Sequence, residues 1–215
     1  CMEFRRMPFD TQRCPVRMGS YSATASEIEL RWKPTALPGV EGLKRDTWEV
    51  TGTLQRDKID VYGYGMMLRT ESVDSLVARF TDEAAAIKGM GFKATKMKVG
   101  LGLRDDMRLI EAVRRGVGDD YRFMIDANHA YTTHDAFYMG RAMEEFDPYW
   151  FEEPVAPEDL DGYRELRQGL RVNISGGEAE FNRWGWRALL ESRGLDIAQP
   201  EVCALGGISE YLRVL

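Results

Sequence analysis

The sequence predicts an α/β protein built on part of a (β/α)₈ barrel, with about six of the strand-helix units present. Two observations predict this fold. From about Ile59 onward, short β-rich runs alternate with amphipathic stretches of helical length, which is the pattern of a parallel sheet. Charged residues also recur every 23 to 28 positions near the ends of the β-rich runs. This interval is close to the roughly 31 residues per unit of a 250-residue barrel.

The individual elements follow from composition and spacing. Strands are predicted at Ile59–Met66, Ala94–Val99, Arg122–Asp126, Tyr149–Glu152, Asn173–Gly177 and Leu195–Gln199. Helices are predicted near Val73–Met90, Arg104–Gly116, Thr133–Phe146, Asp159–Gln168 and Asn182–Ser192, several with Asp, Thr or Asn as N-cap. A last helix begins at Ile208 and has no C-terminal stop signal, so the chain is expected to be a fragment of a longer barrel protein.

Two segments differ in character. Residues 1–57 are rich in Arg and Pro and contain only short apolar runs, and we interpret them as the remnant of an N-terminal capping region. Residues 58–215 are predicted to form the partial barrel domain, which would carry the catalytic site.

A doubly wound dinucleotide-binding sheet is the competing architecture. It requires a glycine-rich turn after the first strand, where this chain has no glycine from Met67 to Thr70. The barrel is therefore preferred.

Composition limits the function classes. The net charge of -6, with basic residues interspersed among acids, disfavours a nucleic-acid surface and leaves a small molecule as the expected partner. Three cysteines without metal or redox spacing are interpreted as packing residues in a reducing compartment. No membrane span or signal peptide is recognisable, so a cytoplasmic protein with no membrane partner is expected.

Three carboxylates are predicted to share one site. Asp126, Glu152 and Glu178 follow three consecutive strands, and barrel enzymes place their functional groups at such carboxyl ends. Carboxylate oxygens are ligands that Mg²⁺ prefers. Each acid taken alone is equally well read as a solvated loop residue. The three in register favour a magnesium site.

Lys96 and Lys98 flank Met97, so both lysines share one face of a strand while Met97 faces the other side. If that face is the barrel interior, the two ammonium groups lie near the carboxylates. Repulsion between them, together with a nearby cation, is expected to lower their pKa values, as a general base near neutral pH requires. The alternative is an outer strand with two solvated lysines.

The ordered motifs resemble those of the mandelate racemase and muconate lactonizing enzyme branch of the enolase superfamily. They are Lys96-Met97-Lys98-Val99-Gly100, Asp126-Ala127-Asn128, Glu152-Glu153-Pro154, Gly177-Glu178, and Gln199-Pro200-Glu201 before Gly206-Gly207. The resemblance implies that Asp126, Glu152 and Glu178 bind Mg²⁺, Lys98 removes the substrate proton, Lys96 neutralises the substrate carboxylate, and Asn128 lines the site.

The sequence departs from this family at Glu201, where the family has Asp. That residue orients a catalytic His on the following strand, which this sequence does not contain. His129, in the loop after Asp126, is a candidate for substrate contact or a solvent-facing residue, and His134 begins the next helix. Glu153 is predicted to face away from Glu152, and Trp150, Phe151, Trp184 and Trp186 are interpreted as core and helix-packing residues.

The resemblance implies removal of the proton α to a carboxylate, with dehydration of a sugar acid to a 2-keto-3-deoxy acid as the favoured outcome. Racemisation or epimerisation of a 2-hydroxy acid through the same enediolate is the first alternative. An inactive barrel fragment is the alternative of another class, and no turnover is expected from this chain by itself. The full-length enzyme is expected to be a homo-oligomer.

Overall fold

The computed structural model describes residues 30–36, 44–50 and 61–214, and the chain divides into two compact units after residue 60. In the first unit, β1 (Leu30–Ala36) pairs antiparallel with β2 (Lys44–Val50). The other residues of the predicted capping region lie outside the described residues, and its capping role stays a prediction.

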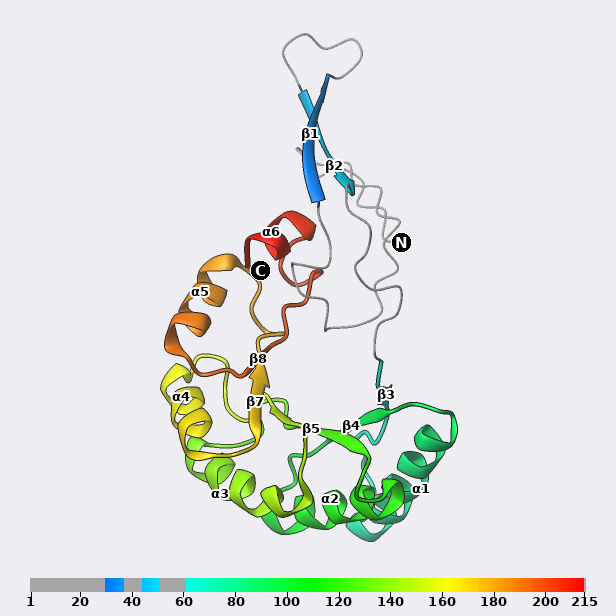
Figure 1. Ribbon diagram of the computed structural model, residues 1–215. Coiled ribbons are helices and arrows are strands. Elements are labelled where there is room, and N and C mark those ends of the chain that lie inside the picture. The colour runs from blue at the N-terminus through cyan, green and yellow to red at the C-terminus, as the bar shows by residue number, and fades with distance from the viewer. Residues whose placement is uncertain (1–29, 37–43, 51–60, 215) are drawn as a thin grey trace. The chain divides into compact units, whose positions relative to one another are not determined.

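In residues 61–214, strands and helices alternate as the sequence predicts (Figure 1). The strands are β3 (Gly63–Tyr64), β4 (Ala94–Lys98), β5 (Arg122–Asp126), β6 (Trp150–Glu152), β7 (Asn173–Gly176) and β8 (Ile197–Ala198). The helices are α1 (Val73–Gly89), α2 (Leu103–Val117), α3 (Thr133–Met143), α4 (Leu160–Gly169), α5 (Arg183–Ser192) and α6 (Ile208–Val214), with a 3₁₀ turn, η2 (Glu144–Phe146), after α3.

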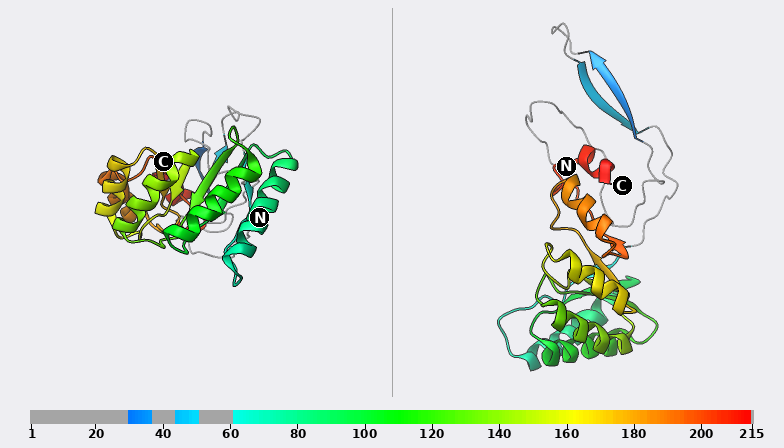
Figure 2. Two further views of the ribbon diagram at one scale, coloured as in Figure 1. Left: turned by 90° about the horizontal axis from the view of Figure 1, so that it is seen from below. Right: turned by 90° about the vertical axis from the view of Figure 1, so that its left-hand side faces the viewer.

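The strands form one parallel sheet in the order β3-β4-β5-β6-β7-β8, which is also their order in the sequence. In Figure 1 the helices lie along the outer side of these strands, and in the side view of Figure 2 α4 and α5 lie in front of the strands that they cover. A doubly wound sheet reverses its strand order and has helices on both faces. The described part of the chain therefore has the architecture of a barrel wall.

The first and last strands are shorter than predicted. β3 ends at Tyr64, and two residues later Met66 adopts a left-handed conformation with φ of 53° that extended backbone does not have. The Met66 N–H donates to Glu83 of α1 at 2.6 Å and not to a strand. β8 contains two of the five predicted residues, because it pairs only where Ser175 and Gly176 of β7 face it.

Helix starts follow the predicted capping chemistry. The side chains of Ser72, Thr132, Asp159 and Asn182 accept backbone N–H groups in the first turns of α1, α3, α4 and α5. The apolar faces of the helices then pack on the sheet. In α1 this face consists of Leu76, Phe80, Ala84 and Ile87, whose three- and four-residue spacing places them on one side of the helix.

The start of α2 is capped differently. Its N-cap is Gly102, which has no side chain, and the buried carboxylate of Asp106 accepts the N–H groups of Gly100, Leu101 and Gly102 at 2.7 to 3.1 Å. Gly100 and Gly102 have φ of 137° and 102°, values that residues with a Cβ rarely adopt. Asp106 thereby fixes the loop that follows the lysine-bearing strand β4.

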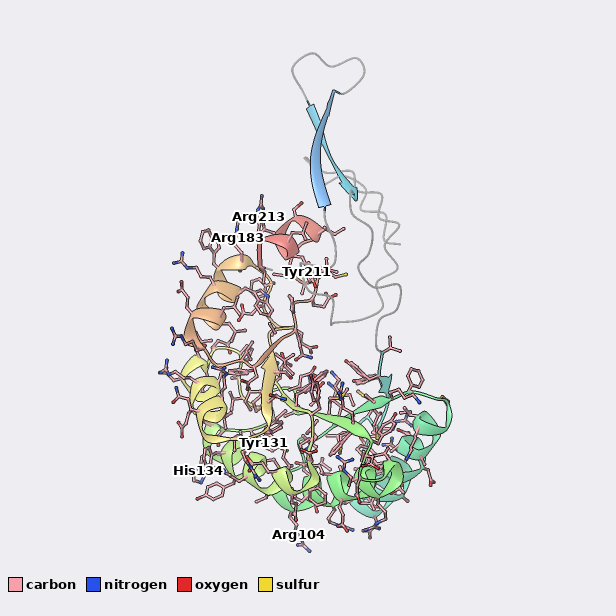
Figure 3. All side chains as sticks on the ribbon, in the orientation of Figure 1. Arg104, Tyr131, His134, Arg183, Tyr211 and Arg213 are labelled. Atoms are coloured by element: carbon pink, nitrogen blue, oxygen red, sulfur yellow. The ribbon has the colours of Figure 1, made fainter. Side chains whose placement is uncertain are left out.

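Several predictions about single residues are settled by exposure. Phe151 and Trp186 are buried as predicted, whereas Trp184 is 66% exposed and is not a packing residue. Cys203 is free and exposed, which contradicts its interpretation as a packing residue. His134 lies on the outer side at α3, edge-on to Tyr138 (Figure 3). No helix among the described residues is long and apolar enough to cross a membrane.

Candidate active site

The candidate site is organised by the register of four strands. Lys98 is paired with Asp126, Asp126 with Glu152, and Glu152 with Ser175, so these residues form one row across β4, β5, β6 and β7. Partners in a parallel sheet project to the same face. Met97 projects to the other face, where it is fully buried in the core beneath the helices. The two lysines therefore share one face, as the spacing predicts, and this face is the one opposite the helices.

The charged groups of this row are in direct contact. Lys96 Nζ lies 2.8 Å from Asp126 Oδ2 and 2.6 Å from Glu152 Oε1, so one ammonium bridges two carboxylates. Lys98 Nζ lies 2.6 Å from the same Asp126 oxygen. Asp126 and Glu152 are fully buried and Lys96 is 6% exposed. The result is a buried, formally neutral cluster of two ammonium groups and two carboxylates, which we call the lysine–carboxylate cluster.

Burial and charge act in opposite directions on these groups. Burial disfavours the ammonium form of Lys96, but the carboxylates of Glu152 and Asp126 outweigh it and raise its pKa above the ordinary value. For Asp126, burial is likewise outweighed, by Lys96 and Lys98, and the pKa is lowered. Burial and the nearby Asp126 raise the pKa of Glu152. Without a bound cation the pKa of Lys96 is thus raised, because its closest charged partners are carboxylates, and the lowering expected beside a cation stays a prediction.

The loop after β5 brings both predicted substrate-binding residues to the cluster. The Asn128 side-chain oxygen accepts a hydrogen bond from Lys98 Nζ, and the Asn128 backbone N–H donates to Asp126 Oδ1 at 3.1 Å. His129 is held on both ring nitrogens: Nε2 lies 3.2 Å from Glu153 Oε2, and Nδ1 lies 3.3 Å from the Val155 carbonyl oxygen. Its side chain is 31% exposed. The structure therefore places Asn128 beside the proposed base and ties His129 to Glu153.

Glu153 is a residue that the sequence reasoning missed. It was predicted to face away from Glu152, but β6 ends at Glu152 and Glu153 has φ of 42°, so the alternation of a strand does not apply to it. The side chain is buried beside His129 and Asn128. Burial, followed by the charges of Glu178 and Asp126, raises its pKa to about 7. The Pro after the pair was the available signal that the strand stops there.

Glu178 is placed apart from the other two predicted ligands. β7 ends at Gly176, and Gly177 then turns with φ of 112°, so Glu178 lies beyond the row and its side chain is exposed. Among the residues that the structure describes, no three His, Cys, Asp or Glu side chains are grouped as a metal ion requires. The effect of Glu178 on Glu153 nevertheless places its charge near the site.

Two of the three predicted ligands, Asp126 and Glu152, have their carboxylate oxygens placed where they could bind one hard cation together. The Lys96 ammonium lies between carboxylate oxygens of Asp126 and Glu152, at the position of a cation that both would share. Such oxygens suit Mg²⁺. Two buried polar atoms in the same part of the sheet, Ser175 Oγ and Gln199 Oε1, also lack a protein partner within residues 61–214.

Glu201 is not brought into the lysine–carboxylate cluster. It follows β8, where its carboxylate accepts the Ala204 N–H at 2.8 Å and its carbonyl oxygen accepts the Leu205 N–H at 3.0 Å. Glu201 therefore stabilises a turn in this structure, and its predicted catalytic part stays a prediction.

The lysine–carboxylate cluster is also bordered by aromatic residues that the sequence analysis did not assign to the site. The Tyr64 ring centre lies 5.5 Å from Lys96 Nζ and 5.9 Å from Lys98 Nζ, and the Tyr62 ring lies 5.9 Å from Lys96 Nζ. Trp150 donates a hydrogen bond to Glu152. Sequence reasoning read Trp150 only as apolar volume, although its position two residues before Glu152 places it on the same strand face.

Known proteins resemble this chain over most of its length. It is 40% identical to D-galactarolactone cycloisomerase of Agrobacterium fabrum over 159 residues, which are 74% of this chain and 42% of that protein. It is 31% identical to arabinonate dehydratase of Saccharolobus solfataricus over 188 residues, 83% of this chain and 50% of that protein. The chain thus spans about half the length of these curated relatives.

The fold is shared with solved structures. A racemase from Streptomyces coelicolor, solved with bound magnesium, superimposes with a TM-score of 0.67 at 31% identity and covers 73% of this chain and 46% of that chain. Residues 79–215 match the model of a family described as enolase C-terminal domain-like. The chain therefore belongs to the enolase C-terminal domain-like family, within the enolase superfamily that its ordered motifs predict.

Proposed function

We propose that this protein takes part in Mg²⁺-dependent removal of the proton α to the carboxylate of a sugar acid, followed by loss of the β-hydroxyl to give a 2-keto-3-deoxy acid. The observation that carries the proposal is the lysine–carboxylate cluster, in which a candidate base, Lys98, lies beside a pair of carboxylates that already share one cationic group. An arabinonate dehydratase among the relatives supports the reaction, and a relative with bound magnesium supports the metal.

Each residue of the cluster has a stated part. Asp126 and Glu152, with Glu178, would hold the Mg²⁺, which supplies positive charge to the substrate carboxylate as negative charge accumulates there. Lys98 would transfer its ammonium proton to water and part from Asp126, and its neutral amine would then accept the α-proton. Asn128 orients the Lys98 amine, and Lys96 supplies a second positive charge to the substrate carboxylate. Glu201 would orient the donor that protonates the departing hydroxyl.

Two other outcomes begin with the same proton removal. Reprotonation on the opposite face gives racemisation or epimerisation, which the Streptomyces coelicolor racemase supports. A cycloisomerisation, in which a ring oxygen departs in place of the hydroxyl, is supported by the relative at 40% identity.

An inactive barrel segment is the candidate of another class. Among the described strands, β3 and β8 each pair with one neighbour, so their other edges carry unpaired backbone groups. The His that the family resemblance implies as proton donor is also not among the site residues that the structure describes. A cytoplasmic location and a homo-oligomeric full-length enzyme complete the proposal.

The experiment separates proton removal from product formation. The 215-residue chain is incubated with Mg²⁺ and each of a panel of sugar acids in D₂O, and ¹H NMR follows the α-proton. We expect the unmodified chain to cause loss of that signal for one acid and Lys98→Ala to cause no loss. We also expect the unmodified chain to form no more 2-keto-3-deoxy product than Lys98→Ala forms. Exchange that persists in Lys98→Ala would remove the base assignment. Binding of an acid without exchange would favour the inactive segment.

A further inference from the structure

Trp150 and Glu152 lie on the same face of β6 because they are two residues apart. The indole Nε1 of Trp150 donates a hydrogen bond to Glu152 Oε2 at 2.9 Å. Trp150 is 8% exposed and Glu152 is fully buried, so water does not compete for this bond. A buried indole N–H needs a partner, and here that partner is a proposed metal ligand.

The two oxygens of Glu152 have different partners. Oε1 contacts the Lys96 ammonium at 2.6 Å, whereas Oε2 accepts the Trp150 N–H. The side-chain amide of Gln199 also hydrogen-bonds Glu152. A cation that binds Glu152 competes with Lys96, which has the same charge sign. It does not repel the neutral indole, so the Trp150 contact is compatible with a bound cation.

Trp150 is itself held in place by aromatic neighbours. The Tyr62 ring lies 5.9 Å away at 83°, an edge-to-face arrangement, and the Tyr149 ring lies 5.5 Å away at 50°. A side chain fixed in this way limits the rotation of the carboxylate that it contacts. Hydrogen bonds from such supporting groups determine the orientation of metal ligands, and their loss typically lowers metal affinity 10- to 100-fold.

We propose that Trp150 is a positioning residue that holds Oε2 of Glu152 and leaves Oε1 directed toward the cation, a role that rests on the metal assignment proposed above. Trp150 does not touch substrate in this scheme and acts only through Glu152. Its indole N–H, and not its apolar bulk, carries the role.

The test compares Trp150→Phe, which keeps an aromatic ring and removes the N–H, with the unmodified chain. Mg²⁺ affinity is measured by isothermal titration calorimetry, and urea unfolding checks that the variant is folded. We expect Trp150→Phe to weaken Mg²⁺ binding about 10-fold or more. The matched control, Trp184→Phe, removes an indole that is 66% exposed and should bind Mg²⁺ like the unmodified chain.

A second measurement does not depend on the folding of Trp150→Phe. The unmodified chain is labelled with ¹⁵N-tryptophan, and the Trp150 indole resonance is identified as the one that changes position in Glu152→Gln. Addition of Mg²⁺ to the unmodified chain should shift the Trp150 resonance and leave the Trp184 resonance unchanged. The positioning role alone would be overturned if folded Trp150→Phe bound Mg²⁺ with unchanged affinity. It would also be overturned if calorimetry recorded Mg²⁺ binding while the Trp150 resonance did not shift. No Mg²⁺ binding by the unmodified chain would overturn the metal assignment and this role together.

Discussion

The Tyr131 hydroxyl donates a hydrogen bond to Asp106 Oδ2 at 2.6 Å, which joins the loop after β5 to the first turn of α2. The same carboxylate caps three backbone N–H groups of the loop after β4. The segments that follow Lys98 and Asp126 are thus held by one buried acid. This contact couples the stability of the fold to the geometry of the lysine–carboxylate cluster.

Asp106→Asn is therefore expected to destabilise the protein by about 2 to 3 kcal/mol, because the amide replaces one acceptor oxygen with a donor that faces N–H groups. Urea unfolding followed by circular dichroism measures the change. Asp105→Asn, one residue earlier and outside this network, should change stability by less than about 0.5 kcal/mol. Equal effects of the two substitutions would show that the Asp106 contacts carry no special weight.

Gly177→Ala is expected to be strongly destabilising. A Cβ at this position would lie 2.2 Å from the ring of Trp186, which is 1% exposed, and the residue has φ of 112°. Strain and overpacking together should cost about 2 to 4 kcal/mol, measured as a lower urea midpoint. Gly102→Ala is the control, because its φ is 102° and no atom lies within 4 Å of the added Cβ. An equally large loss of stability in Gly102→Ala would show that backbone strain at positive φ, and not the contact with Trp186, causes the whole effect.

The Glu144–Arg171 pair predicts a pH dependence. Glu144 accepts the Arg171 N–H at 2.7 Å and Nε at 3.0 Å, and although burial opposes them, these contacts lower the pKa of Glu144 below its ordinary value of 4.5. A lowered carboxyl pKa stabilises the fold above the unfolded-state pKa, and this stability disappears as the pH falls through the folded-state value.

Glu144→Gln should consequently cost about 1 kcal/mol at pH 7, and the difference from the unmodified chain should shrink steadily below about pH 4.5. Urea unfolding from pH 7 to pH 3 measures this. The exposed neighbour Glu145 provides the control, and Glu145→Gln should show no such pH dependence. A difference that stays constant with pH would mean that the pair contributes through packing and not through charge.

Lys96→Met tests the electrostatics of the lysine–carboxylate cluster. The substitution leaves buried Asp126 and Glu152 without their bridging ammonium, and breaking a buried ion pair in this way typically costs 3 to 5 kcal/mol. Lys93→Met, at an exposed position one residue before the same strand, should cost little. Thermal unfolding of both variants gives the comparison. A stable Lys96→Met protein would indicate that the two carboxylates share a proton or separate.

Periodicity predicted most of the fold. Every strand–helix unit from β4 to α5 was anticipated because buried parallel strands and capped amphipathic helices leave strong local patterns. The boundaries that failed, at β3 and β8, depend on tertiary contacts: a left-handed Met66 and the length of the neighbouring strand β7 decide where pairing stops.

The positions of the site residues could be predicted where strand alternation applies, and the prediction failed beyond the ends of the strands. Lys96, Lys98, Asp126 and Glu152 share a face because of a two-residue period and of register. Glu153 and Glu178 lie past strand ends, where single backbone angles decide direction, and no periodicity reports those angles. The hydrogen bond of Trp150 could not be anticipated, because apolar bulk and an oriented donor look alike in a sequence.

The sequential strand order also has a consequence for synthesis. Each strand from β4 to β8 pairs with the strand made just before it, so a growing chain meets its partner as soon as the next unit leaves the ribosome. The charged groups arrive in the same order, with the two lysines first, then Asp126 and then Glu152. Asp126 and Glu152 are therefore synthesised after Lys96, the ammonium group that both of them contact.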